Sequence, residues 1–370
     1  MTGSVRLLAA WSLAVSVGCG PAAPTPAPPP PPATASATPP TASEDQVDLL
    51  APWTGPYDGV PPWAATANTA AFGPAIDRAI ASWLDEVKVI AESTEPATFD
   101  NTLAALEKSG RPLDRVTTLF FVLASSRNTP DVQKLAGVIR PKLSKAEDRV
   151  YFDEKLFARV AVVHKYRAQL TPQQKRLVEK SYDAFVRRGA QLDGAKKKRM
   201  GEINERLATL FTDFGNRVQA DEDSAVQLTK ADLGGLPDAL VGVYETAAKE
   251  RKMEGYAVVN TRSAVDPFLT FYDRRDHREK VWRAFVHRGD HGDENDTTAI
   301  IAEIVALRAE RANLLGYASH AHWRMSDTMA KDPQKAMRLM NQVWPVAKQR
   351  VREEVRDMQR LAAAEGQKIT

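Results

Sequence analysis

The dominant pattern in this chain is apolar residues spaced three or four apart. Between residues 200 and 218 they would fall on one face of a helix. These positions are Met200, Ile203, Leu207, Leu210, Phe211, Phe214 and Val218. The same spacing recurs over residues 300–315 and again over 333–364, where Met340, Val343, Val346 and Val351 mark the apolar side. The pattern predicts a mainly α protein.

The sequence also predicts where several helices begin and end. Threonine precedes proline at residues 129–130 and 171–172, which is typical of a capping residue followed by the first helical position. Gln174 completes a capping box with the second of these threonines. Gly316 stands just past the apolar stripe at 300–315, where a left-handed C-terminal cap is expected.

One stretch departs from the helical pattern. Tyr256–Asn260 and Phe268–Tyr272 are short and rich in β-branched or aromatic residues, and Gly255 and Pro267 punctuate them. Such runs are typical of strands. We therefore expect a short β-hairpin, or two short strands, near residues 256–272.

The N-terminus has the form of an export signal. Arg6 precedes an apolar run over residues 7–17, and small residues lead to Cys19. The run is shorter than the roughly 20 residues that a membrane span requires. We interpret residues 1–19 as a lipoprotein signal peptide with lipid attachment at Cys19, which predicts an exported, membrane-anchored protein facing the periplasm. The alternative is an ordinary secretory peptide with an incidental cysteine.

Residues 20–46 are rich in proline and alanine, and the first charged residue among them is Glu44. Proline holds such a segment extended and hydrated, so we expect a disordered tether between the anchor and the folded part. Because Cys19 is the only cysteine, no disulfide forms within the chain.

Charge excludes one class of function. The chain carries 50 basic and 47 acidic side chains, a net charge of +3. Nucleic-acid-binding domains show a clustered basic face, and these charges are well mixed. The single basic run, Lys196–Arg199, comes before a helical pattern and is predicted to be solvated. No nucleic-acid partner is expected.

Histidine is the side chain that most commonly binds metal ions in proteins. The histidines of this chain are His164, His277, His287, His291, His320 and His322. None begins a His-Glu-x-x-His motif, which places two ligands and a base on one helix face. The pair at 287 and 291 has that spacing, but glycines at 289 and 292 favour a polar loop. The pair at 320 and 322 would point to different sides of a helix.

An acidic segment follows the first of these pairs. It contains Asp290, Asp293, Glu294 and Asp296 and lacks the order of a calcium-binding loop. We interpret it as a solvated loop leading into a helix over residues 297–315. The chain has no Gly-x-Ser-x-Gly motif, glycine-rich phosphate loop or nucleophilic cysteine pattern. From the residues alone, no catalytic or metal-binding residue is predicted.

Three ordered segments resemble the thimet oligopeptidase family of zinc metallopeptidases, on its bacterial peptidyl-dipeptidase and oligopeptidase A branch. They are LLAPWTGPYDGVPPW at 49–63, TFDNTLAALEKSGRPLDRV at 98–116, and the long block from FLTFYDRRDHREK to LLGYASHAHW at 268–323. The resemblance runs over essentially all of residues 47–370. Its order along the chain is more specific than any single segment.

The resemblance implies an elongated helical molecule with a deep channel, zinc at the channel floor and short peptides as substrate. In that family the zinc motif follows the region matched here, so no site residue is carried over to this chain. We therefore expect the N-terminal half of a channel-type zinc peptidase. Residues 47–262 would form an N-terminal helical region, and 263–370 the start of the catalytic domain.

Two functions follow from these observations. In the first, the chain is the N-terminal portion of a lipid-anchored zinc metallopeptidase that hydrolyses short peptides in the cell envelope. It is then inactive alone, and the missing C-terminal half is its partner. In the second, it is a non-catalytic helical lipoprotein that acts as a peptide-binding or scaffolding module.

Overall fold

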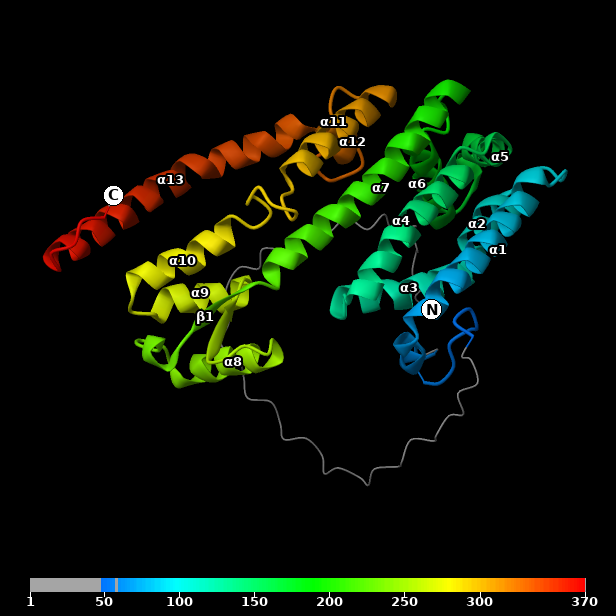
Figure 1. The fold of residues 1–370 in the computed structure, drawn as a ribbon. Coiled ribbons are helices and arrows are strands. Elements are labelled where there is room, and N and C mark those ends of the chain that lie inside the picture. The colour runs from blue at the N-terminus through cyan, green and yellow to red at the C-terminus, as the bar shows by residue number, and fades with distance from the viewer. Residues whose placement is uncertain (1–47, 57–58, 370) are drawn as a thin grey trace.

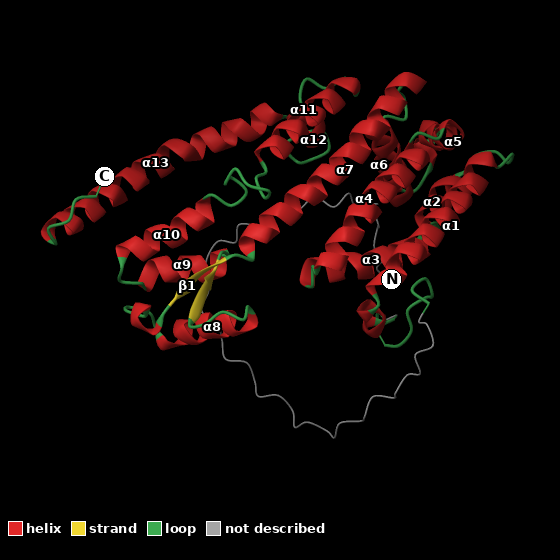
Figure 2. Ribbon diagram, viewed as in Figure 1, coloured by secondary structure: helices red, strands yellow, loops and turns green. Residues whose placement is uncertain are grey.

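The computed structural model describes residues 48–56 and 59–369. It confirms the mainly α class, because the regular elements of the described residues are helices apart from one two-stranded antiparallel sheet and an isolated bridge between Thr54 and Val60 (Figures 1 and 2). The predicted signal peptide, Cys19 and the predicted tether lie outside the described residues. None of the described helices has the length and apolar character that crossing a membrane demands.

The N-terminal part of the described chain is a bundle of six α-helices. Their bounds are α1 Phe72–Glu92, α2 Ala105–Lys108, α3 Arg111–Ser126, α4 Pro130–Tyr151, α5 Glu154–Lys165 and α6 Pro172–Arg188. Short 3-10 turns and one π-helical turn, Phe99–Ala104, connect or extend them. Helices α4 and α6 begin at their prolines, as predicted, and Thr171 caps α6, but Thr129 makes no side-chain capping hydrogen bond to α4. The capping box between Thr171 and Gln174 is also present.

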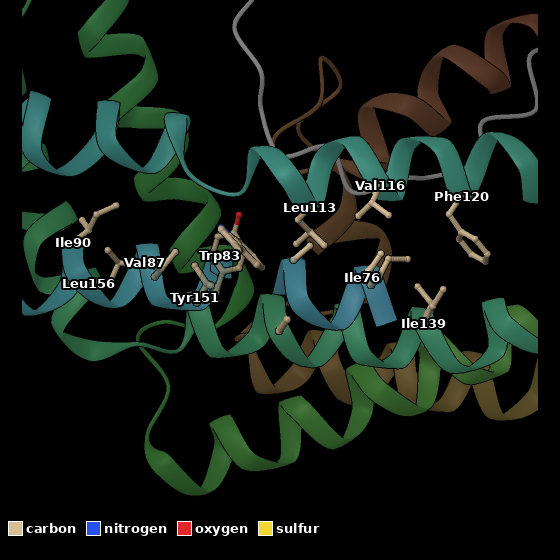
Figure 3. Close-up of a cluster of buried hydrophobic side chains, with 14 of the residues drawn as sticks. Ile76, Trp83, Val87, Ile90, Leu113, Val116, Phe120, Ile139, Tyr151 and Leu156 are labelled. Carbon is tan, nitrogen blue, oxygen red and sulfur yellow. The ribbon is translucent and has the colours of Figure 1, made fainter. Parts of the chain in front are cut away.

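The bundle core forms around α1. Its buried residues recur every three or four positions, as one apolar face requires. They are Phe72, Ala75, Ile76, Ala79, Trp83, Val87, Ile90 and Ala91. This face packs against α3, α4 and α5. Figure 3 shows the resulting row of side chains, with Phe120 and Val116 of α3 on one side of Ile76 and Ile139 of α4 close by.

A glycine allows α2 and α3 to turn sharply against this core. Gly110 adopts φ +72°, and a Cβ atom there would lie 2.7 Å from Cδ1 of Trp83. Its backbone N–H donates a 2.9 Å hydrogen bond to Oε2 of Glu86. Only glycine combines the left-handed conformation with so close an approach.

The 29-residue helix α7 (Gly194–Glu222) links the bundle to the rest of the chain. The stripe predicted from residue 200 is confirmed, with Met200, Ile203, Leu207 and Leu210 buried. The prediction that the basic run Lys196–Arg199 is solvated is wrong for Lys197, which is buried at 9% exposure. Its Nζ donates to the backbone oxygen of Phe152 at 3.2 Å and to Glu154 at 3.1 Å. Residues 196–199 lie within α7 itself, which turns this lysine toward α4 and α5.

Beyond α7 lies a second, smaller core. It is built from β1 (Ala225–Leu228), α8 (Asp238–Glu250), β2 (Tyr256–Val259), α9 (Arg262–Phe271) and α10 (Arg275–Val286). The strands pair antiparallel, with Ala225 opposite Val259 and Leu228 opposite Tyr256. Buried apolar residues of both strands and of α8, α9 and α10 close over one side of this sheet.

The prediction of a hairpin within residues 256–272 is wrong in its second strand. Residues 256–259 form a strand as predicted, but its partner is β1, and residues 268–271 belong to α9. Val265, Phe268 and Tyr272 are buried at helical spacing, and the Phe268 and Tyr272 rings stack 4.4 Å apart. A five-residue apolar run is compatible with either period. Packing against Tyr244 of α8 therefore outweighs the β propensity of these aromatics.

The C-terminal elements are α11 (Thr298–Leu314), α12 (His320–Met325) and α13 (Pro333–Ala364). Helix α11 packs along α7, and Gly316 follows it with φ +79°, confirming the predicted cap. Helix α13 confirms the third long pattern. Helix α13 extends away from α12 (Figure 1). Its main contacts with the rest of the chain are those with α12.

Candidate functional site

The loop between α10 and α11 is organised by one buried carboxylate. Asp221, near the end of α7, is 7% exposed, and its Oδ2 accepts a 2.6 Å hydrogen bond from the backbone N–H of Gly289. The same oxygen lies 3.6 Å from Nε2 of His291. Thr297 Oγ1 donates to the Gly289 carbonyl at 3.0 Å, which closes the base of the loop. Asp221 therefore fixes the loop on α7.

The two histidines of this loop do not share a helix face, and the predicted polar loop is confirmed. His287 caps α10, and His291 lies in the turn that follows. Their ring centroids are 6.5 Å apart, and each ring faces a carboxylate: Asp290 at 3.6 Å for His287 and Asp221 for His291. Across residues 48–56 and 59–369, no three His, Cys, Asp or Glu side chains gather as a metal site would need.

The acidic segment leads into α11, as predicted. Asp296 accepts hydrogen bonds from the backbone N–H groups of Gly292 at 2.9 Å and Thr298 at 2.8 Å. These bonds, first of all the one from Thr298, lower the pKa of Asp296. A carboxylate at a helix N-terminus is stabilised by the unpaired N–H groups and the helix dipole. Asp296 is thus a structural capping residue for α11.

A second cluster lies where α6, α11 and α12 meet. Trp323 of α12 donates its indole N–H to the backbone oxygen of Arg187 at 3.0 Å. The guanidinium carbon of Arg187 lies 5.5 Å from the Trp323 ring, and that of Arg311 lies 4.6 Å from it. Arg187 also pairs with Asp327 at 3.2 Å. These cation–π contacts hold α12 against the bundle.

This arginine cluster carries more positive than negative charge. Burial, aided by Arg308 and Arg311, lowers the pKa of His320 to about 4, so this histidine is neutral at physiological pH. Burial and Arg308 likewise lower the pKa of Arg311 to about 10. Within this cluster, the buried nitrogens that lack a hydrogen-bond partner among the described residues are Arg187 Nη1, Arg308 Nε, Arg311 Nε and His320 Nδ1. Arginines in such a setting favour carboxylate partners.

The sequence predicted no role for these arginines. Arg308 and Arg311 are three positions apart, which puts them on one side of α11. That spacing is the only signal in the sequence, because Arg187 lies more than a hundred residues earlier. His320 lies partly buried in the cluster. His322 instead bonds the α12 cap, with Nδ1 2.8 Å from Ser319 Oγ.

A carboxyl group of α4 lies next to this cluster. Asp148 accepts a 2.8 Å hydrogen bond from Nδ2 of Asn204 in α7. Arg311 donates to the other side of the same amide, at Oδ1, over 3.3 Å. Burial raises the pKa of Asp148 to about 7, although the Asn204 bond and the charges of Arg188 and Arg311 act in the opposite direction. Folding therefore shifts this carboxyl toward its neutral form.

Asp148→Asn is expected to make folding less sensitive to pH. The folded pKa lies above the unfolded value of about 3.9, so the folded state holds a proton that the unfolded state releases. The free energy of unfolding therefore falls as pH rises from about 4 through 7. We expect the variant to gain about 1–2 kcal/mol over wild type at pH 8 and to match it near pH 4. Urea unfolding at both pH values measures this, with the exposed Asp85→Asn as control.

The sequence of the chain is similar to those of known peptidases. Residues 268–370 match the sequence model of Peptidase family M3. Dipeptidyl carboxypeptidase of Escherichia coli is 32% identical over 293 residues, covering 78% of this chain and 43% of that protein. The chain is thus similar in sequence to peptidases of family M3 over most of its length. Oligopeptidase A of Salmonella typhimurium is 26% identical over 303 residues, covering 79% of this chain and 44% of that protein.

A plant relative is also similar to most of this chain and is much longer than it. The organellar oligopeptidase A of Arabidopsis thaliana is 27% identical over 295 residues, which is 76% of this chain and 36% of the relative. The chain thus spans less than half the length of the curated relatives it matches. The M3 match covers the loop organised by Asp221, part of the arginine cluster and all of α13.

Proposed function

We propose that this chain is the N-terminal portion of a lipid-anchored M3 zinc metallopeptidase that hydrolyses short peptides in the cell envelope. The observation that carries the proposal is the 32% identity to a dipeptidyl carboxypeptidase across 78% of the chain. The M3 match over residues 268–370 supports the same reading. Attachment through Cys19 rests on the sequence pattern of residues 1–19.

The described residues do not fit a zinc centre. They contain no group of three metal-ligating side chains, and His287 and His291 face different carboxylates, Asp290 and Asp221. The whole sequence has no His-Glu-x-x-His motif. In this proposal the zinc ligands and the base come from a further polypeptide segment. This chain supplies helices that wall the peptide-binding channel.

The genomic DNA beyond codon 370 tests this proposal directly. We expect a His-Glu-x-x-His motif in the same or an adjacent reading frame, because the family's zinc chemistry requires those ligands. The chain alone should neither bind zinc tightly nor cleave a short peptide. Absence of the motif at this locus, or chelator-sensitive hydrolysis by residues 48–370, contradicts the proposal.

A non-catalytic peptide-binding lipoprotein is the competing function. It predicts that the chain alone is soluble, folds cooperatively and binds short unfolded peptides without zinc. Calorimetric titration with such peptides separates the two proposals. The Cys19→Ser variant tests the anchor shared by both, since it should lose incorporation of labelled fatty acid and leave the membrane fraction.

A further inference from the structure

Apolar side chains are distributed unevenly between the two parts of the molecule. Of 44 buried hydrophobic residues in the described part, six lie in the M3-matched segment 268–370. Of 23 large hydrophobic residues that are exposed there, 15 lie in that segment. Exposed apolar side chains that gather in one part of a protein mark an interaction site. The matched segment therefore has an incomplete core.

Helix α13 contributes most of this surface. None of its 32 residues is buried. Met337, Trp344, Val351 and Met358 follow one another at seven-residue intervals and are 49%, 63%, 56% and 51% exposed. Met340 and Leu361 lie in the neighbouring row and are 55% and 68% exposed. A heptad spacing is the pattern by which one helix packs against another. At 1.5 Å per residue the stripe from Met337 to Leu361 is about 36 Å long.

Other elements of the segment expose apolar residues as well. Ile300 and Ile304 of α11 are buried against α7, but Ile301 and Val305 on another side of the helix are 47% and 59% exposed. Trp282 of α10 is 47% exposed. A helix with apolar residues on all sides is typical of a protein interior. The surface to be covered thus extends beyond α13.

The flank of the α13 stripe is basic. Arg338, Lys348, Arg352 and Arg356 fall on one side of it at 100° per residue, and none pairs with a carboxylate in the described residues. The acidic residues of the helix are already paired: Glu353 and Glu354 with Arg350, and Asp357 with Arg360. An occupant with acidic residues beside its apolar stripe would complement this flank.

Charge disfavours a second copy of this chain as the occupant, because antiparallel self-pairing brings the two basic flanks together. A membrane surface would suit a basic amphipathic helix. It would leave the exposed residues of α10 and α11 unexplained, although they belong to the same M3-matched segment. The relatives, in contrast, are more than twice as long as their matched parts.

We propose that the apolar stripe of α13, with its basic flank, is the docking surface for a helical polypeptide with acidic flanking residues. That polypeptide corresponds to the part of the M3 relatives outside the matched region. The inference rests on the proposed function and names the partner of this chain within it.

Hydrogen–deuterium exchange over residues 333–364 tests the docking surface. The full chain is compared with a chimera in which it replaces the matched part of the Escherichia coli dipeptidyl carboxypeptidase. We expect rapid exchange of α13 in the chain alone, since little packs against it, and slowing by at least about tenfold in the chimera. Equal exchange in both proteins overturns the proposal.

Two double variants with matched spacing sharpen the test. Trp344→Ser with Val351→Ser removes the stripe, whereas Gln342→Ser with Gln349→Ser alters the opposite, polar side. All four positions are exposed in the chain alone. Only the first pair should abolish the added protection in the chimera. Equal effects of the two pairs also contradict the proposal.

The other occupants are measured on the full chain alone. Sedimentation velocity reports self-association, and flotation with phosphatidylglycerol–phosphatidylethanolamine vesicles reports membrane binding. Either property, if the stripe variant removes it, overturns the proposal. Peptidase activity of the chimera is scored separately. A protected α13 in an inactive chimera counts against the proposed function alone, and an active chimera with an unprotected α13 counts against docking alone.

Discussion

Phe120→Ala is expected to lower the free energy of unfolding of the N-terminal bundle by about 3–5 kcal/mol. Phe120 has no exposed surface and lies in the core between α1 and α3. Its ring packs 5.5 Å from that of Phe72 and 5.3 Å from that of Phe121 (Figure 3 shows the Phe120 side chain). Removing the ring loses its apolar burial and leaves a cavity that close-packed helices fill only in part.

Chemical denaturation followed by circular dichroism measures this loss. Val122→Ala, two residues along the same helix, is the matched control because Val122 is 36% exposed. It should cost less than about 1 kcal/mol. A similar loss in both variants would show that α3 does not pack as described.

Asp221→Ala is expected to cost about 2–4 kcal/mol and to release the loop between α10 and α11. The substitution leaves the Gly289 N–H without its 2.6 Å acceptor and removes the negative charge beside His291. Arg288 and Glu222 remain paired at 2.6 Å, so the loop stays attached at that point. Local exchange over residues 287–297 should rise more than exchange in the bundle.

A graded series separates the hydrogen bond from the charge. Asp221→Asn keeps an acceptor oxygen for Gly289 and should recover more than half of the loss. Asp290→Ala removes a 71% exposed carboxylate from the same loop and should be nearly silent. If Asp290→Ala were as damaging as Asp221→Ala, Asp221 would not be the organising residue.

Helix positions could be predicted from the sequence because their signals are local. The α7 stripe, the Thr-Pro starts of α4 and α6 and the Gly316 cap each depend on residues within a few positions of one another. The strand at 256–259 was predicted, but its partner 31 residues earlier was not. The wrong strand at 268–272 has the same cause, since Tyr244 is distant in sequence.

The interactions that organise the candidate site could not be predicted from the sequence, because they join residues that lie far apart along the chain. Lys197 was predicted to be solvated because its neighbours are basic, yet α5 supplies Glu154 as its partner. Asp221 and Gly289 are 68 residues apart, and Arg187 meets Trp323 across 136. Such pairs arise from the packing of whole helices. The family resemblance, in contrast, was visible in ordered segments and is confirmed by the comparisons.

The exposed face of α13 shows how a pattern and its burial can differ. The spacing of Met340, Val343 and Val351 predicts a helix with one apolar side, and α13 forms over that range. Periodicity reports which side is apolar and not what covers it. All three side chains are more than half exposed. The helix is therefore best understood as one side of an interface.

The most direct test of the account is the composition of the native protein. An antibody raised against residues 48–370 would isolate it from the membrane fraction of cells that carry the gene, for mass spectrometry and metal analysis. The account predicts an associated or continuous polypeptide that contains His-Glu-x-x-His, close to one zinc per complex, and peptide hydrolysis that a chelator abolishes. A zinc-free chain of 40.7 kDa or less, without such a polypeptide, would contradict it.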